Sequence, residues 1–181
     1  MKRVGAPWPA RLLQLHGVSD SKKIPEARRL QLFKELVASN QLVYATCIVD
    51  SRTIDEINIL QATFKAMEGA VAGLPLPVPD FTLVDGNMLP KAFHPEKSMA
   101  IVAGDATCMS ISVASIIAKV TRDNLMFEYD RRWPDYGFAK HKGYPTREHI
   151  CAINRLGPCE IHRMSYAPLQ KQASESPEYI E

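Results

Sequence analysis

The sequence lacks any apolar stretch close to the roughly 20 residues that a transmembrane helix requires. No membrane partner is therefore expected. It also lacks a strong charge of one sign, because 22 Lys and Arg residues face 20 Asp and Glu residues and leave a formal net charge of +2. Total charge therefore does not indicate a nucleic-acid-binding protein, and any affinity for phosphate must come from local clusters.

Cysteine is scarce, and its spacing excludes two classes of site. The four cysteines are Cys47, Cys108, Cys151 and Cys159, and no two of them form a C-x-x-C pair. Neither a zinc knuckle nor a thioredoxin-type redox site is indicated. Residues 1–17 are basic and contain no acid, but they lack the apolar core of a secretory signal. We therefore expect reduced thiols in a reducing compartment.

The remaining pattern predicts one α/β domain with a substantial core. Apolar residues at helical spacing alternate with short runs of β-branched and aromatic residues. Thr53 and Glu56 have the spacing of a capping box, and Thr146 is the expected cap of the last helix. The predicted helices cover residues 25–37, 53–73, 110–133 and 146–157, and the predicted strands cover residues 42–49, 81–84 and 99–103. This order implies a sheet with helices packed against it.

Two acidic residues stand just beyond the carboxyl ends of predicted strands. They are Asp85 and Asp105, and in open α/β sheets this edge is where sites form. Two carboxylates that meet there would repel each other unless a cation bridged them, and their hard oxygen atoms suit Mg²⁺ or Mn²⁺. The structural alternative makes Asp85 a turn residue before Gly86 and Asn87, and Asp105 a residue that caps the next helix.

A third acid, Asp123, lies four residues after Lys119 on the predicted long helix, so that the two side chains share a face. In the functional interpretation, Asp123 points toward the carboxylate pair as a supporting acid. In the structural interpretation, the two residues form a surface ion pair worth roughly a few tenths of a kcal/mol. Their spacing alone does not choose between these interpretations.

Two short basic segments could bind phosphate. The first contains Ser21, Lys22 and Lys23, with one hydroxyl and two ammonium groups. The second covers residues 140–144 and places Tyr144 next to a glycine, where its ring could stack on a sugar or base and sense a 2′-hydroxyl. The alternative for either segment is a solvated loop, which is what charged runs usually are.

Three histidines, His141, His149 and His162, have no recognisable metal-ligand spacing. We expect them to be ordinary polar residues of loops and helices.

Several segments, taken together and in order, resemble ribonuclease HII. No single one is decisive, but the ordered set is highly specific and extends over about residues 18–169. The segments are 20–23 (DSKK), 54–63 (IDEINILQAT), 84–87 (VDGN), 104–105 (GD), 114–123 (ASIIAKVTRD), 136–144 (YGFAKHKGY), 156–159 (LGPC) and 162–163 (HR).

This resemblance implies a ribonuclease H-like mixed sheet flanked by helices, with a C-terminal helical part. It implies two-metal-ion hydrolysis of the RNA strand of RNA–DNA hybrids, including at single ribonucleotides in duplex DNA, with Mg²⁺ or Mn²⁺. Asp85 matches the third of the family's four metal-binding acids and Asp105 matches the fourth. Asp123 is expected among the catalytic residues. Bacterial-type members act alone in the cytoplasm, so a cytoplasmic monomer is expected, or an organellar protein if the source is eukaryotic.

The resemblance also implies how the substrate is held. Tyr144 matches a tyrosine that packs against the ribonucleotide sugar, and Ser21, Lys22 and Lys23 match a loop that contacts the nucleic-acid backbone. The further residues expected to bind substrate are Lys119 and Lys142.

The chain departs from the family at its N-terminus. The family opens with a strand that carries an Asp-Glu pair and a Gly-Arg-Gly segment, and residues 1–17 contain neither. We therefore expect a divergent segment 1–17, a truncated ribonuclease HII-like domain over 18–169 without the first two strands, and a polar tail over 170–181. The strand at 42–49 would be separated from that at 81–84, leaving unpaired backbone groups, weak stability and weak or absent activity in the isolated chain. The alternatives to an active nuclease are a chain that only binds hybrids and a non-functional fragment.

Overall fold

The computed structural model describes residues 24–39, 42–75, 77 and 79–170. The chain divides into two compact units, each built from two stretches of sequence. The first unit comprises the described residues of Met1–Tyr44 and Pro75–Val120, and the second comprises those of Ala45–Leu74 and Thr121–Glu181. Each unit is described by itself.

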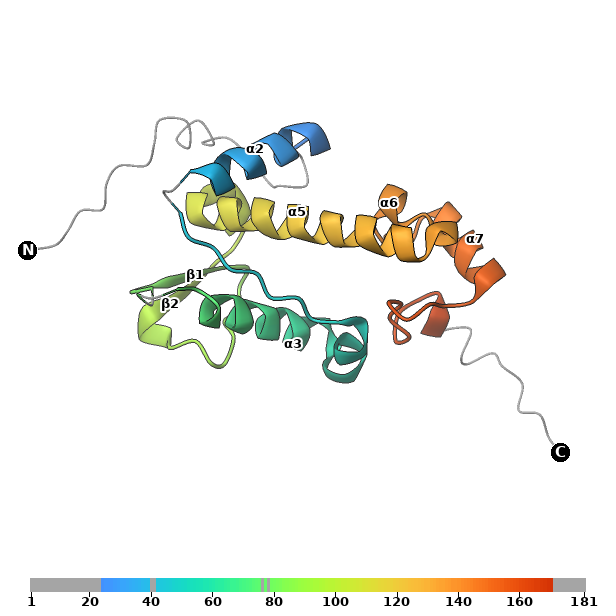
Figure 1. Ribbon diagram of the computed structural model, residues 1–181. Coiled ribbons are helices and arrows are strands. Elements are labelled where there is room, and N and C mark those ends of the chain that lie inside the picture. Colours follow the sequence, from blue (N-terminus) through green and yellow to red (C-terminus); the bar gives the residue numbers. More distant parts are fainter. Residues whose placement is uncertain (1–23, 40–41, 76, 78, 171–181) are drawn as a thin grey trace, which may run out of the picture. The chain divides into compact units, whose positions relative to one another are not determined.

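The first unit contains two parallel strands, β1 (Thr82–Asp85) and β2 (Ser98–Ile101). Thr82 pairs with Ser98 and Asp85 pairs with Ile101, so the two carboxyl ends lie at the same edge (Figure 1). A 3-10 helix, η1 (Pro95–Lys97), leads into β2. Both strands that the sequence predicted here are confirmed to within two residues.

Two helices form the core of the first unit. Helix α2 (Glu26–Ala38) lies beside the first turns of α5 (Met109–Arg132), a helix that begins in this unit and ends in the second (Figure 1). Apolar residues at helical spacing on both helices meet in one buried cluster. Its members are Leu32, Leu36, Val113, Ile116 and Ile117. The predicted helices at 25–37 and 110–133 are therefore confirmed.

The strand predicted at residues 42–49 is wrong. Residues 42–50 have no regular secondary structure, although their β-branched and aromatic composition suits a strand. Val43 is 66% exposed and Ile48 is 60% exposed. A strand needs a neighbour for its N–H and C=O groups, and the sheet among the described residues consists of β1 and β2 alone.

The second unit begins with α3 (Ser51–Ala72), which starts earlier than predicted. Its N-cap is Asp50, whose carboxylate accepts a 2.7 Å hydrogen bond from the Thr53 N–H. The capping box expected at Thr53 is therefore displaced by three residues. Asn58 interrupts the helix with φ 65°, and its side-chain oxygen accepts hydrogen bonds from the N–H groups that begin the next segment. The helix ends at Gly73, as predicted.

Three short elements complete the second unit: η2 (Pro134–Tyr136), α6 (Phe138–His141) and α7 (Arg147–Leu156). Thr146 caps α7 by accepting from the His149 N–H, as the sequence predicted. A second buried cluster joins these elements to the C-terminal segment. Its members are Tyr136, Phe138, Ala152, Ile153 and Leu169. The expected C-terminal helical part is confirmed.

Within the described ranges, no helix is both long enough and apolar enough to cross a membrane.

Candidate active site

Asp85 and Asp105 lie at the shared carboxyl edge of the two strands. Asp85 is the last residue of β1 and is exposed, and Asp105 lies in the short helix α4 (Gly104–Thr107) that follows β2. The side-chain Oδ1 of Asp85 accepts a 2.8 Å hydrogen bond from the Gly104 N–H. The parallel pairing and this bond place the two acid-bearing segments side by side. We refer to Asp85, Gly104 and Asp105 as the acid edge.

Gly104 permits this close approach because it has no side chain. A Cβ atom built at Gly104 would lie 2.5 Å from Cδ1 of Ile111 and 3.4 Å from Oδ1 of Asp85. The preceding residue, Ala103, has φ 52°, a left-handed conformation that is uncommon for a residue with a side chain. Ser112 of α5 donates to the Asp105 carbonyl and so fixes the turn from the other side.

The donor set at the acid edge fits a hard divalent cation, because carboxylate oxygens are the ligands that Mg²⁺ and Mn²⁺ prefer. Among the described residues, however, no group of three or more His, Cys, Asp or Glu side chains is arranged to hold a metal ion. Asp85 and Asp105 are the two acids at this edge within the described ranges, and their role as metal ligands remains a prediction.

Asp123 is buried on α5, with 5% of its surface exposed, and Lys119 is half-buried one turn earlier. Asp123 belongs to the second unit, whereas Lys119 belongs to the first together with the acid edge. Because Asp123 is buried, a solvated surface pair does not describe it. Its part in catalysis and that of Lys119 in substrate binding remain predictions.

The second basic segment forms a tight loop at Lys142, Gly143 and Tyr144, which we name the tyrosine loop. Lys142 has φ 53° and Gly143 has φ 77°, so the chain turns through two consecutive left-handed residues. Tyr144 is 51% exposed, whereas Lys142 is 8% exposed. The Lys142 ammonium donates to the Ala139 carbonyl and lies 3.6 Å from the centre of the Phe127 ring. Tyr144 is therefore accessible to solvent, whereas the Lys142 side chain is directed into the protein.

Arg122 holds the tyrosine loop from α5. Its guanidinium donates a 2.8 Å hydrogen bond to the Lys142 carbonyl and lies 5.4 Å from the centre of the Tyr144 ring. The sequence placed Arg122 in a family-like segment but gave it no role. Its partner lies 20 residues away in the sequence, so that local spacing carries no signal of this contact.

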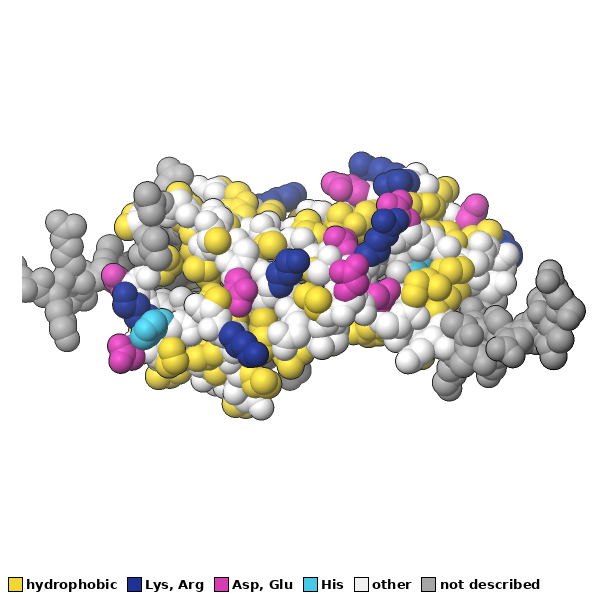
Figure 2. Space-filling view, turned by 90° about the horizontal axis from the view of Figure 1, so that it is seen from below, with side chains coloured by type: hydrophobic (Ala, Val, Ile, Leu, Met, Phe, Trp, Pro, Cys, Tyr) yellow, Lys and Arg dark blue, Asp and Glu magenta, His cyan; other side chains and the backbone are white. Residues whose placement is uncertain are grey.

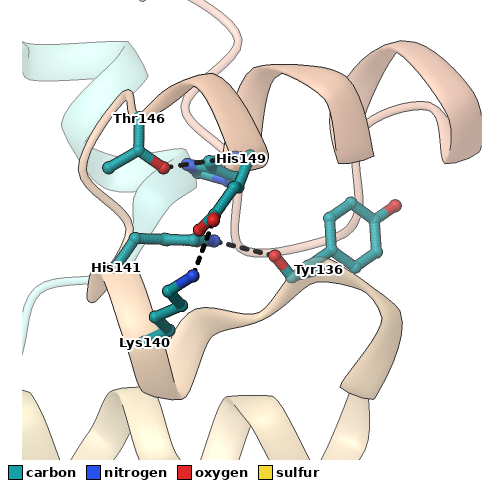
Figure 3. A network of polar contacts seen from close by, with 6 residues as sticks. Tyr136, Lys140, His141, Thr146 and His149 are labelled. Carbon is teal, nitrogen blue, oxygen red and sulfur yellow. Dashed lines mark hydrogen bonds and ion pairs between the residues drawn. The ribbon is translucent and has the colours of Figure 1, made fainter.

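The structure brings together three histidines that the sequence treated as unrelated. His141 and His149 stack with their ring centres 4.2 Å apart (Figure 3). Nε2 of His149 lies 3.1 Å from Nε2 of His162. His141 and His149 are each 6% exposed. We name His141, His149 and His162 the histidine cluster. Their contacts depend on tertiary packing, which no sequence spacing reveals.

The remaining predicted substrate-binding residues, Ser21, Lys22 and Lys23, lie outside the described residues. On the face shown in Figure 2, Lys and Arg side chains are interspersed with Asp and Glu side chains. On that face, phosphate recognition would therefore depend on individual side chains rather than on one broad basic field.

Comparison with known proteins identifies the family. The sequence profile of ribonuclease HII matches residues 7–169. The chain is 47% identical over 156 residues to a ribonuclease HII from Francisella tularensis subsp. novicida, covering 86% of this chain and 82% of that protein. It is 46% identical over 157 residues to a ribonuclease HII from Aliivibrio fischeri, covering 87% of this chain and 74% of the relative.

A solved structure supports the fold. The ribonuclease H2 of Pyrococcus horikoshii OT3 superimposes with a TM-score of 0.67 at 23% identity, covering 90% of this chain and 82% of that one. The α/β fold class predicted from the sequence is confirmed. Membership of the family matched by the profile supports divalent-metal-dependent cleavage of RNA in RNA–DNA hybrids. The chain belongs to the ribonuclease HII family of nucleases.

Proposed function

We propose that the chain hydrolyses the RNA strand of RNA–DNA hybrids and also cuts at single ribonucleotides embedded in duplex DNA. The observation that carries this proposal is the acid edge, where two parallel strands bring Asp85 and the Asp105 segment together. Family membership supports the reaction class, which is hydrolysis of RNA in hybrids. The acid edge would supply the carboxylate oxygens that a metal-dependent hydrolysis requires.

The chemistry sets the task of these residues. When bound, a pair of Mg²⁺ or Mn²⁺ ions supplies an activated water and stabilises the leaving oxyanion of the phosphodiester. Asp85 and Asp105 would hold the metal, and neither needs to carry a proton. The Gly104 N–H orients the carboxylate of Asp85, and we assign to Asp123 a supporting role among the acids.

Substrate selection rests on the tyrosine loop. The exposed ring of Tyr144 is proposed to pack against the ribonucleotide sugar, where a site built around a 2′-hydroxyl rejects DNA. Lys119 is proposed as a phosphate contact, together with Ser21, Lys22 and Lys23. Because the Lys142 ammonium lies against Phe127, Lys142 would contribute chiefly by shaping the loop.

The test is cleavage of a labelled DNA duplex that contains one ribonucleotide, with Mg²⁺ or Mn²⁺ added to the full chain. An all-DNA duplex and the D85N variant serve as controls. We expect cutting at the ribonucleotide that requires the metal and is lost in D85N. Salt-dependent hybrid binding without any cleavage would contradict the proposal and identify a chain that binds hybrids without cutting them.

A further inference from the structure

Two members of the histidine cluster, His149 and His162, lie in one continuous chain of hydrogen bonds. It starts at the Cys159 N–H, which donates to Nδ1 of His162 at 2.9 Å. Nε2 of His162 lies 3.1 Å from Nε2 of His149. Nδ1 of His149 lies 3.0 Å from the carbonyl oxygen of Tyr144. A backbone N–H thus stands at one end of the chain and a backbone carbonyl at the other.

The hydrogen bond at the Tyr144 end determines where the ring protons lie. A carbonyl oxygen only accepts, so Nδ1 of His149 must carry a proton that it donates to Tyr144. Nδ1 of His162 lies 2.9 Å from the Cys159 nitrogen, 3.1 Å from its Sγ and 3.2 Å from its carbonyl oxygen, so that the Cys159 end alone fits either tautomer. A neutral His162 then carries its proton on Nε2 and donates it to the bare Nε2 of His149. With both rings neutral, the proton on Nδ1 of His149 thus sets the other positions, and Nδ1 of His162 is left to accept from the Cys159 N–H.

His141 completes the arrangement beside this chain. Its Nε2 lies 2.7 Å from the Tyr136 carbonyl oxygen (Figure 3). Its Nδ1 lies 3.1 Å from the Gly143 nitrogen, which carries a proton. By the same reasoning, Nε2 donates to Tyr136 and Nδ1 accepts from Gly143. The stacked His149 ring covers one face of His141.

These contacts converge on the tyrosine loop. Arg122 donates to the Lys142 carbonyl, the Gly143 N–H donates to His141, and His149 donates to the Tyr144 carbonyl. Three consecutive residues therefore each have one backbone group bound by a side chain that does not belong to the loop. A left-handed backbone conformation, as at Lys142 and Gly143, is maintained when the surrounding structure holds the residue in place.

We propose that His141, His149 and His162 are positioning residues for Tyr144. The three rings hold the tyrosine loop in its substrate-ready conformation, and they do so only while His149 and His162 are neutral. This inference rests on the proposed role of Tyr144 at the ribonucleotide sugar. The histidines themselves touch neither the substrate nor the metal. They act on substrate affinity through the backbone of residues 143 and 144.

Protonation would reverse the polarity of this network. A proton added to Nε2 of His149 would place two N–H groups face to face with His162. Burial lowers the pKa of both His149 and His162, while the Tyr144 carbonyl beside His149 opposes the shift of that ring, so that both rings are neutral near pH 7. The other titratable or charged groups around them, from α6, η2, α7 and the C-terminal segment, are His141, Lys140, Tyr136, Glu148 and Cys159.

A matched pair of variants tests the direction of the bond to Tyr144. Asparagine in H149N can place an amide N–H where Nδ1 stood, whereas glutamine in H149Q reaches the Nε2 position and leaves the Tyr144 carbonyl without its donor. Neither amide titrates. We expect H149Q to raise KM for the ribonucleotide duplex roughly five- to tenfold and H149N about twofold, with kcat nearly unchanged, since one hydrogen bond is at stake. C151S, an exposed position on the same helix, is the control.

Nuclear magnetic resonance on the ¹⁵N-labelled full chain tests the proton positions without relying on activity. We expect protons on Nδ1 of His149 and on Nε2 of His141 and His162 at pH 7.5, and a KM for the wild type that rises as His149 and His162 become protonated. A proton on Nε2 of His149, or equal KM values for H149N and H149Q with cleavage intact, would overturn this proposal alone. A wild-type chain that neither binds nor cuts hybrids would overturn it together with the proposed function.

Discussion

The tyrosine loop in the second unit and the acid edge in the first are held by different means. The loop is fixed by side chains that approach from α5, α6 and α7. The acid edge is fixed mainly by backbone geometry, through the register of two short strands and the N–H of Gly104. Side-chain support can be weakened one group at a time, whereas backbone support fails when the close approach of the chain is blocked. Substrate binding and turnover should therefore respond to different substitutions.

The largest expected effect separates turnover from binding. D85N removes a charged metal ligand, and we expect cleavage to fall by roughly a hundredfold or more while hybrid binding persists. Y144A should do the reverse, because losing an aromatic stacking surface costs roughly 1–3 kcal/mol of binding. Single-turnover rates and hybrid affinities of the two variants provide the comparison. Equal losses of affinity in both variants would show that the acid edge and the loop do not act separately.

Next in size is G104A, which blocks the close approach at the acid edge. Its new methyl group would overlap Ile111, whose Cδ1 lies 2.5 Å from the built Cβ. We expect a loss of roughly 1–3 kcal/mol in the free energy of unfolding, measured by urea denaturation, together with reduced cleavage. The double variant G104A/I111V should recover part of the stability, since it removes the methyl group that clashes. Unchanged stability of G104A would mean that the side chain of Ile111 or the backbone of the acid edge shifts easily to accommodate the new methyl group.

A smaller effect on stability is expected when the pH is lowered. Burial lowers the pKa of His149 and of His162 below the ordinary value of 6.5, so that the unfolded chain binds more protons than the folded chain below that pH. Stability from this source is complete above about pH 6.5 and is lost as the pH falls through the lowered values. Melting temperatures from pH 7.5 to 5.0 measure this loss. The melting temperature of the variant H149N/H162N should depend less on pH. An unchanged dependence would show that other groups cause the acid sensitivity.

The smallest effect concerns the ion pair at the rim of the histidine cluster. Lys140 and Glu148 lie 2.6 Å apart (Figure 3), but their side chains are 74% and 61% exposed. Exposed pairs contribute little because solvent screens them. K140A should therefore leave both the melting temperature and KM at wild-type values. A clear rise of KM in K140A would show that the lysine itself touches the substrate.

Sequence reasoning succeeded where the signal is local and periodic. The apolar spacing on α2 and α5 and the residues that end α3 and α7 predicted those helices closely. It was wrong for residues 42–49, because a strand depends on a partner as well as on composition. It also misplaced the start of α3, since Asp50 offered a competing cap.

The candidate site shows the same division. The positions of Asp85 and Asp105 after their strands followed from strand and turn signals. The histidine cluster did not, because its members come from α6, α7 and the C-terminal segment. The support that Arg122 gives to residue 142 was likewise invisible. Contacts between residues far apart in sequence arise only when the fold exists.

The start of α3 is tied to the C-terminal segment, and this affects the order of events during synthesis. The Asp55 carboxylate accepts from the N–H groups of Met164 and Ser165, and Ser51 donates to the Glu160 carbonyl. These partners are 109 or 110 residues apart. A nascent chain that leaves the ribosome N-terminus first must therefore release residue 165 before these bonds can form. The contacts of the second unit at the start of α3 can therefore form only after residue 165 has emerged, more than a hundred residues after Asp55.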